Sequence, residues 1–155
     1  MTEITEGTPA PAFDLPTDGD ANISLGGLKG RTAVLYFYPK ADTPGCTNEG
    51  KDFTALAADF ASAGAVVTGV SKDPVKKLQK FKAKHDLDVV LASDETAGVT
   101  EAYGVWVEKS MYGKTYMGIE RATFLIDGQG IVRRIWRRVS VKGHAEEVLA
   151  AVRAL

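Results

Sequence analysis

The segment from Val34 to Cys46 constrains the fold of this chain more than any other stretch. It begins as an apolar, aromatic run that is typical of a buried strand, and it breaks at Pro39. Beyond the break, apolar residues return at helical spacing, at Phe53, Leu56, Ala57 and Phe60. The sequence therefore predicts a strand, a turn and a helix, with the only cysteine of the chain where the helix begins.

The position of Cys46 in this helix favours a reactive sulfur. Thr43 is a suitable N-cap and Pro44 a suitable first helical residue, which places Cys46 at the third helical position. Unpaired N–H groups and the positive end of the helix dipole stabilise a thiolate at such a position. A lone cysteine in a globular protein is more often buried and inert, so other residues must distinguish the two cases.

Composition limits the classes of function. The chain has 155 residues, which suits one domain over 1–155, and its formal net charge of −1 gives no reason to expect a nucleic-acid or anionic-membrane partner. No apolar run approaches the roughly 20 residues of a membrane span, and the N-terminus lacks the pattern of a secretory signal. One cysteine rules out an intramolecular disulfide and fits a reducing compartment, so we expect a cytoplasmic protein.

Alternating strand and helix patterns predict an α/β fold. Expected strands cover residues 33–38, 65–70, 89–92, 122–126 and 131–139, with short extended pieces at 13–15 and 22–25. Expected helices cover residues 43–63, 74–85, 93–103 and 145–155, and residues 104–118 are expected to be irregular. The βαβ part should be parallel and the last hairpin, which turns at residues 127–130, antiparallel. This order predicts a thioredoxin-like fold, a mixed central sheet flanked by helices, with an insertion around residues 72–118.

The spacing Pro39-x-x-x-Thr43-x-x-Cys46, together with Arg121 at a strand start, resembles the active-site pattern of the peroxiredoxins. The chain is most similar to the peroxiredoxin Q or bacterioferritin comigratory protein subfamily. Matching stretches run over nearly the whole length, at residues 9–15, 38–40, 43–49, 69–73, 103–105 and 121–127. The resemblance implies a thiol-dependent peroxidase that reduces hydrogen peroxide and organic hydroperoxides, and so an antioxidant role.

The resemblance assigns three of these residues to the chemistry. Cys46 would be the peroxidatic nucleophile, which attacks one peroxide oxygen and becomes a sulfenic acid. Arg121 would be the cation that stabilises the thiolate and donates to the peroxide as charge builds on its leaving oxygen. The Thr43 hydroxyl, which can donate one hydrogen bond and accept others, would orient the peroxide beside the sulfur.

Pro39 is the fourth residue that the resemblance places in the catalytic site, and two further residues, Glu49 and Trp136, receive supporting roles. Pro39 would shield the site from water and fix the loop, since it has no N–H that competes for the ligand. Glu49, one helical turn beyond the cysteine, would orient the arginine, and Trp136 would form part of the pocket wall. With one cysteine and two scattered histidines, we expect no metal and no cofactor.

One departure from the subfamily concerns how the sulfenic acid is reduced back to the thiol. Many members carry a resolving cysteine five residues after the peroxidatic one, and this chain has Lys51 there. The sulfenic acid must then be reduced by an external thiol, such as thioredoxin, glutaredoxin or a small thiol, or by a second chain. We expect a monomer or a weak homodimer.

Two other functions stay open on the sequence alone. The protein can be a peroxide-sensing thiol switch, in which Cys46 forms a mixed disulfide with a client, or a thioredoxin-fold module that binds a partner without turnover. A basic cluster surrounds Trp136, at Arg133, Arg134, Arg137 and Arg138. It is either a solvated strand edge that blocks aggregation or a docking patch for an acidic reductant or an anion.

Overall fold

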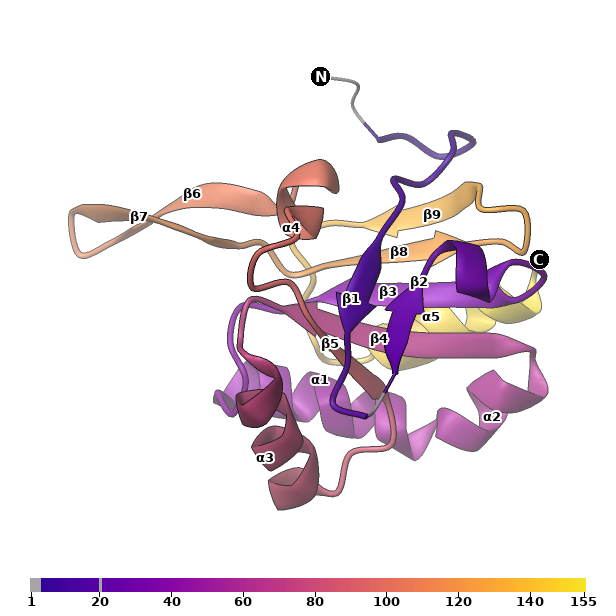
Figure 1. Cartoon of the computed structure of the whole chain (residues 1–155), viewed down its shortest axis with the longest axis horizontal. Helices are drawn as coiled ribbons and strands as arrows, with labels where there is room; N and C mark the ends of the chain where they lie inside the picture. The colour runs from indigo at the N-terminus through magenta and orange to yellow at the C-terminus, as the bar shows by residue number, and fades with distance from the viewer. Residues whose placement is uncertain (1–3, 20) are drawn as a thin grey trace.

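The computed structural model describes residues 4–19 and 21–155 (Figure 1). Its centre is a five-stranded sheet in the order β5-β4-β3-β8-β9. The strands are β3 (Thr32–Phe37), β4 (Ala65–Ser71), β5 (Val90–Ser93), β8 (Ala122–Ile126) and β9 (Val132–Trp136). β3, β4 and β5 run parallel, whereas β8 pairs antiparallel with both β3 and β9. The expected mixed sheet is confirmed.

Helices connect and cover these strands. They are α1 (Pro44–Ala55), α2 (Ala57–Ser62), α3 (Val75–His85), α4 (Val99–Ala102) and α5 (His144–Arg153), with a short 3-10 helix η1 (Gly26–Leu28). Two small antiparallel pairs stand outside the central sheet, β1 (Asp14–Pro16) with β2 (Asn22–Ser24) and β6 (Trp106–Met111) with β7 (Lys114–Ile119). Within the described residues, no helix has the length and apolar character needed to cross a bilayer.

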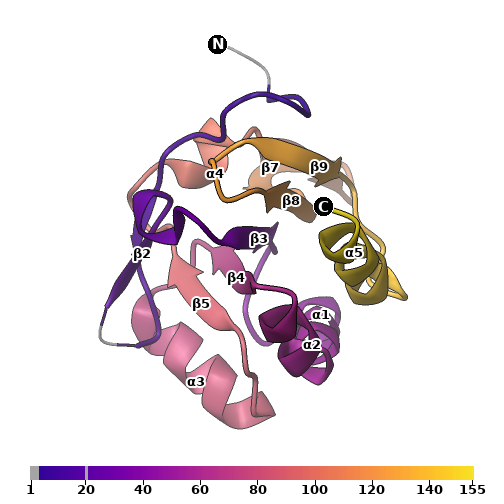
Figure 2. The same ribbon diagram turned by 90° about the vertical axis from the view of Figure 1, so that its right-hand side faces the viewer.

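Strand β3 separates two hydrophobic clusters because its side chains alternate between the two faces of the sheet. Val34 and Tyr36 pack with apolar residues of α1, α2, α3 and α5 on one face. Leu35 and Phe37 pack on the other face with β1, α4 and the residues just before β6. Figure 2 shows the sheet between these two layers. Every residue of β3 after Thr32 is buried, as the apolar run predicts.

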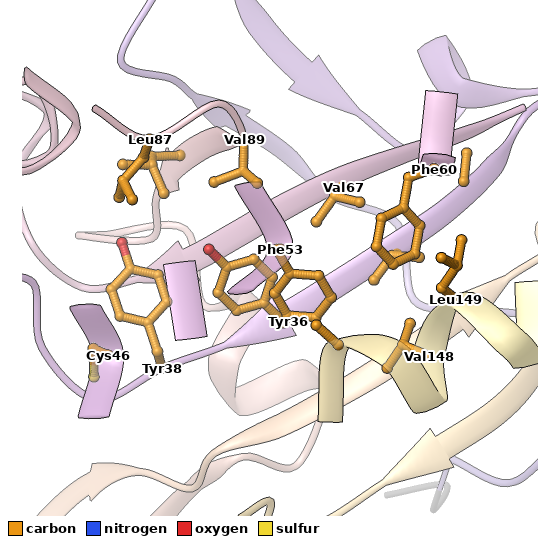
Figure 3. Close-up of a cluster of buried hydrophobic side chains, with 14 of the residues drawn as sticks. Tyr36, Tyr38, Cys46, Phe53, Phe60, Val67, Leu87, Val89, Val148 and Leu149 are labelled. Carbon is orange, nitrogen blue, oxygen red and sulfur yellow. The ribbon is translucent and has the colours of Figure 1, made fainter. Parts of the chain in front are cut away.

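Aromatic side chains fill the cluster beneath α1, and Cys46 lies at one end of it (Figure 3). Tyr36 stacks on Phe53 with ring centroids 4.6 Å apart, and its ring lies over Gly69 of the neighbouring strand. A methyl group at Gly69 would come within 2.6 Å of the Tyr36 ring. The glycine therefore leaves the space that this tyrosine occupies.

The predicted helix over 43–63 is divided in the structure. Leu56 leaves helical geometry, with φ −105° and ψ 11°, so that α1 and α2 are separate helices. Seven residues of a straight helix advance by about 10 Å. The break brings the rings of Phe53 and Phe60 to a centroid distance of 5.8 Å in the core.

Residues 104–118 are not irregular, which corrects the prediction. Most of this segment forms the β6–β7 hairpin, and its two turn residues, Tyr112 and Gly113, have φ of 53° and 77°. Positive φ at both central residues is typical of a type I′ turn, which usually carries Asn-Gly or Asp-Gly. The sequence lacks that dipeptide, and both faces of the hairpin are largely exposed, so no clear apolar alternation marks the strands.

Three other features differ from the prediction: the length of α4, the end of β9 and the extent of the insertion. Helix α4 is one turn long, and the buried Asp94 carboxylate accepts a hydrogen bond from the Thr100 N–H instead of capping a longer helix. Strand β9 ends at Trp136, shortly before Arg138 adopts a left-handed φ of 49°. In the expected insertion at 72–118, β5 extends the central sheet, and only the β6–β7 hairpin stands apart from it (Figure 1).

Replacing Gly69 by alanine is expected to destabilise the protein by about 1–3 kcal/mol, the usual cost of overpacking a core. Tyr36 is fully buried and stacked, so its ring has no free space into which to move. Urea unfolding measures the effect. Gly26→Ala is the matched control, because no atom lies within 4 Å of the added methyl group. Equal stability of the two variants would contradict the packing argument.

Candidate active site

The antiparallel pairing of β3 with β8 brings distant residues together. Phe37, the last residue of β3, pairs with Ala122, the first residue of β8. Arg121 immediately precedes β8, and the loop to α1 immediately follows β3. The side chain of Arg121 therefore reaches Cys46, which lies 75 positions earlier in the sequence.

Cys46 occupies the third position of α1, as predicted, and its side chain is only 2% exposed. Proline stands at the first position and the N-cap is Thr43, with extended backbone. At a helix start the first N–H groups have no partner inside the helix. The sulfur is thus held near backbone donors and near the positive end of the helix dipole.

Arg121 contacts two side chains of α1 at once. Its Nη2 donates to the Cys46 Sγ at 3.3 Å, and its Nη1 donates to the Glu49 Oε1 at 2.6 Å. Although burial opposes ionisation, the pKa of Arg121 is raised because the Glu49 and Cys46 side chains face its guanidinium. The Glu49 carboxylate thus faces one edge of the guanidinium while the other edge faces the sulfur, and the orienting role of Glu49 stays a prediction.

Glu49 is almost wholly buried, with its side chain 1% exposed. Burial raises its pKa to about 7, and the nearby Arg121 guanidinium reduces that rise. The carboxylate therefore changes charge near neutral pH, beside the cation that contacts the sulfur.

The Thr43 hydroxyl does not cap the first turn, although the residue stands at the N-cap. It donates to the Lys40 carbonyl at 2.8 Å, and no side-chain capping bond is present. A carbonyl oxygen can only accept, so the hydroxyl proton is committed to it. The lone pairs of the hydroxyl oxygen stay available to accept a hydrogen bond from a substrate.

Two carboxylates connect the loop between β3 and α1 to β4 and α3. The buried Asp73 accepts hydrogen bonds from the Ala41 N–H and the Ser71 hydroxyl, both at 2.8 Å. Asp42, which has a left-handed φ of 63°, pairs with Lys84 at 2.8 Å and with His85 at 2.7 Å. These contacts fix the backbone immediately before the cysteine.

Two predicted site residues lie further from this constellation. Pro39 is exposed where β3 ends, and its shielding role stays a prediction. Trp136 contacts α5, because its Nε1 donates to Glu147 at 3.1 Å and its ring meets His144 edge-on, while Arg134 stacks on it. His144 is 5% exposed, and its Nε2 lies 2.8 Å from the Thr123 hydroxyl oxygen. The pocket-wall role of Trp136 also stays a prediction.

Sequence reasoning missed the contribution of Gly45. A methyl group at this position would come within 3.1 Å of the Arg121 Nη2. A glycine in the first turn of a helix, next to the cysteine, was the available signal, because alanine is normally preferred there. The missing side chain is what lets the guanidinium approach the sulfur. Within the described residues, no group of three or more acidic, histidine or cysteine side chains is placed to hold a metal ion.

The family model and the curated relatives that match this chain all indicate the same family. The model of the AhpC/TSA family matches residues 7–135. A putative peroxiredoxin bcp of Coxiella burnetii is 50% identical over 146 residues, which cover 94% of this chain and 97% of that protein. The peroxiredoxin Bcp of Xanthomonas campestris is 47% identical over 156 residues, which cover 99% and 98% of the two chains.

Solved structures resemble the fold over nearly the full length. A structure of the Xanthomonas campestris bacterioferritin comigratory protein, studied for its alkyl peroxide reduction activity, has a TM-score of 0.90 and 44% identity, and the match covers 98% of each chain. Peroxidoxin BcpB from Mycobacterium tuberculosis has a TM-score of 0.86 and 35% identity over 99% of each chain.

Glu49 is expected to make stability depend on pH in an unusual direction. Its pKa rises from 4.5 to about 7 on folding, so between these values the folded state binds more protons than the unfolded state. Its contribution is complete below pH 4.5 and is lost as the pH rises through 7, amounting to about 3.5 kcal/mol at about 1.4 kcal/mol per pKa unit.

Urea unfolding between pH 4.5 and 8.5 tests this expectation. The unfolding free energy of the wild type relative to Glu49→Gln should fall as the pH rises. Glu95→Gln is the control, because Glu95 is exposed and should give no such trend. A difference that stays constant with pH, or grows with it, would show that Glu49 is ionised throughout.

Proposed function

This chain belongs to the AhpC/TSA family and is a thiol-dependent peroxidase of the peroxiredoxin class, and we propose that Cys46 is its peroxidatic nucleophile. The observation that supports this assignment best is the 3.3 Å contact between the Arg121 Nη2 and the Cys46 Sγ. A guanidinium donating to the only cysteine, at the start of a helix, is an arrangement that favours a thiolate.

The proposed reaction transfers one oxygen atom to sulfur. The Cys46 thiolate attacks one peroxide oxygen, the O–O bond breaks, and Cys46 becomes a sulfenic acid. The other oxygen leaves as hydroxide or alkoxide and takes up a proton, giving water or an alcohol. Arg121 stabilises the charge that passes from the sulfur to the leaving oxygen, while Glu49 keeps the guanidinium in place.

The same loop would position the peroxide. Because the Thr43 hydroxyl gives its proton to Lys40, its oxygen can accept the O–H of a hydroperoxide. The free N–H groups of the first turn of α1 can donate to the peroxide oxygens. Substrate held from these two directions would lie in line with the sulfur, which is the geometric requirement of such a displacement. The proposed substrates are hydrogen peroxide and organic hydroperoxides.

Reduction of the Cys46 sulfenic acid back to the thiol needs thiols from outside the chain. Cys46 is the only cysteine in the sequence, and Lys51 occupies the position of the subfamily's resolving cysteine. One thiol displaces water from the sulfenic acid and forms a mixed disulfide, and a second thiol releases Cys46 as a thiol. Two thiols are thereby oxidised to a disulfide while one peroxide is reduced. Thioredoxin, glutaredoxin and small thiols are the proposed reductants, for a cytoplasmic monomer or weak homodimer.

Cys46→Ser is expected to abolish peroxide reduction without unfolding the protein, because a serine hydroxyl does not ionise at neutral pH. Rapid mixing with peroxide, followed by tryptophan fluorescence, measures the first step. Intact mass after peroxide without reductant should show added oxygen on the wild-type monomer and none on the variant. Turnover is then measured with each reductant in turn.

The outcomes separate this proposal from its alternatives. Activity of more than a few per cent in Cys46→Ser would refute the assigned nucleophile. Oxidation of the wild type without turnover by any thiol would favour a peroxide-sensing switch, and absence of oxidation would leave a binding module. A Cys46–Cys46 dimer as the main product would place resolution between two chains.

Gly45→Ala is expected to slow the reaction with peroxide by roughly tenfold, since small displacements of positioning groups are costly to rate. The added methyl group displaces the Arg121 guanidinium, which lies 3.1 Å away. Stability should not fall, because alanine favours a helix over glycine. Asn48→Ala, exposed on the same helix, is the control and should retain the wild-type rate. Wild-type kinetics in Gly45→Ala would mean that the guanidinium tolerates the displacement.

A further inference from the structure

The structure divides the basic cluster around Trp136 into two parts. Arg133 and Arg134 lie on β9, where the first forms an ion pair with the turn before the strand and the second stacks on the Trp136 ring. Arg137 and Arg138 follow the strand, in the loop that leads to α5. Figure 2 shows β9 and α5 next to each other at one side of the molecule. The second pair of arginines therefore belongs to a surface that β9 and α5 build together.

A hollow of about 460 Å³ lies between this loop and the start of α5. Its cationic lining residues are Arg137, Arg138 and Lys142. Arg137 is already paired with the Glu120 carboxylate at 3.6 Å. Among the residues that the structure describes, Arg138 and Lys142 form no ion pair. The one carboxylate in the lining, Glu147, accepts the hydrogen bond of the Trp136 indole at 3.1 Å. The lining thus has an excess of positive charge.

The first turn of α5 borders the hollow, since His144 and Glu147 are part of the lining. Gly143 is the N-cap, with a left-handed φ of 76°, and no side chain caps the turn. The first N–H groups of a helix have no partner inside the helix, and they lie at the positive end of its dipole. This end of α5 therefore favours an anion in the hollow.

His144 adds a directed donor to these groups. The residue is only 5% exposed, and its Nε2 lies 2.8 Å from the buried Thr123 hydroxyl oxygen. Within the described part of the chain, that hydroxyl has no other acceptor. Its proton therefore goes to Nε2, because a buried donor left unpaired is costly. A neutral imidazole that accepts at Nε2 carries its own proton on Nδ1. Nδ1 is not sealed from solvent, and His144 lines the hollow.

The imidazole is neutral and held in place. Burial lowers the pKa of His144, although the nearby Glu147 opposes this change, so the ring keeps a single N–H at pH 7. The rings of Phe53 and Trp136 both meet the imidazole edge-on, with centroids 6.2 Å and 5.7 Å away. The Nδ1 donor thus has a fixed direction before any ligand arrives.

We propose that the hollow between β9 and α5 binds the phosphate group of a small molecule. Arg138 and Lys142 would supply charge-assisted hydrogen bonds, and the His144 Nδ1 and the first N–H groups of α5 would supply further donors. Three cations against one carboxylate leave an excess of two positive charges in the lining, which a phosphate dianion neutralises. Inorganic phosphate and phosphate monoesters share this chemistry. The site is separate from the proposed reaction at Cys46 and does not depend on it.

A titration of the ¹⁵N-labelled protein at pH 7.5 and constant ionic strength tests the proposal. Inorganic phosphate and glycerol 3-phosphate should each give saturable shifts of the amide signals of residues 142–147. Acetate should give none. Absence of saturable shifts, or equal affinity for acetate, would overturn the proposal. Shifts confined to residues 43–46 would place the phosphate beside Cys46 and Arg121 and would overturn it as well.

Three variants test the cations of the lining. Arg138→Met and Lys142→Met should each weaken phosphate binding about tenfold, the effect of losing one charge-assisted hydrogen bond. Arg133→Met is the matched control, because Arg133 belongs to the same basic cluster but does not line the hollow. It should keep the wild-type affinity. Equal weakening in all three variants would mean that the attraction is unspecific. Melting temperatures without phosphate show whether each variant is folded.

Cys46→Ser should bind phosphate as tightly as the wild type, whatever its effect on peroxide reduction. Normal binding with no peroxide reduction by the wild type would refute the proposed function and leave this site intact. Loss of binding in Cys46→Ser would place the ligand in the proposed active site and overturn the inference.

Long-range ¹H–¹⁵N spectra of the imidazoles test the part assigned to His144. The Nδ1–H tautomer should be present without phosphate, and the Nδ1 signal should shift as phosphate binds. The Nε2–H tautomer, or an imidazole unaffected at saturating phosphate, would overturn the proposed geometry.

Vesicles of phosphatidylcholine with phosphatidic acid distinguish a lipid headgroup from a free phosphate monoester. In sedimentation the protein should stay in the supernatant, because the phosphate of a packed headgroup cannot enter a hollow of this size. Sedimentation with the vesicles, without binding of glycerol 3-phosphate, would overturn the proposal of a small-molecule site.

Discussion

The shared guanidinium of Arg121 is the interaction on which the rest of the site depends. One cation faces both the Cys46 sulfur and the Glu49 carboxylate, and all three groups are largely removed from water. Burying a second anion beside a single cation is costly, because each charge loses its hydration. The raised pKa of Glu49 reflects this cost. When the carboxyl group is protonated, it can still accept the Arg121 hydrogen bond, so the guanidinium keeps its orientation while more of its charge is available to the sulfur.

The fold holds this arrangement through backbone pairing more than through side-chain contacts. The antiparallel register of β3 and β8 places Arg121 beside the end of β3, and the parallel register of β3 and β4 places Asp73 beside the loop that leads to Cys46. A slip of one residue in either pairing would turn every side chain of the strand to the opposite face. The apolar clusters on both faces of β3 prevent such a slip, since Tyr36 fits only opposite a glycine. Core packing thus sets the position of Cys46, which lies at one end of a core cluster, relative to Arg121.

Local sequence features made much of the fold predictable. Apolar runs indicated the strands, and prolines or glycines at boundaries indicated most helices and the position of Cys46 in its helix. The partnership of Arg121 with Cys46 has no local cause, since it depends on pairing between strands, and only the family resemblance indicated it. The β6–β7 hairpin escaped prediction because Tyr112, an unusual residue for positive φ, occupies its turn. The contacts of Gly45 and Asp73 appear only once the loop is seen in three dimensions.

The lack of a second cysteine changes what the proposed cycle requires of α1. A resolving cysteine five residues after Cys46 would reach it only if the helix unwound, since residues five apart in a helix do not meet. Here Gly50 packs closely against Leu87, the Thr54 hydroxyl accepts the Asp88 N–H, and Glu49 is paired with Arg121. Unwinding would break these contacts without forming a disulfide in exchange. In the proposed cycle the oxidised sulfur would stay where it lies in the structure, 2% exposed, and the reducing thiol would reach it by the route that the peroxide takes. In the proposed cycle a small thiol would reach the sulfur with the helix folded, whereas a protein thiol would require the loop before Cys46 to open and the contacts of Asp73 and Asp42 to break.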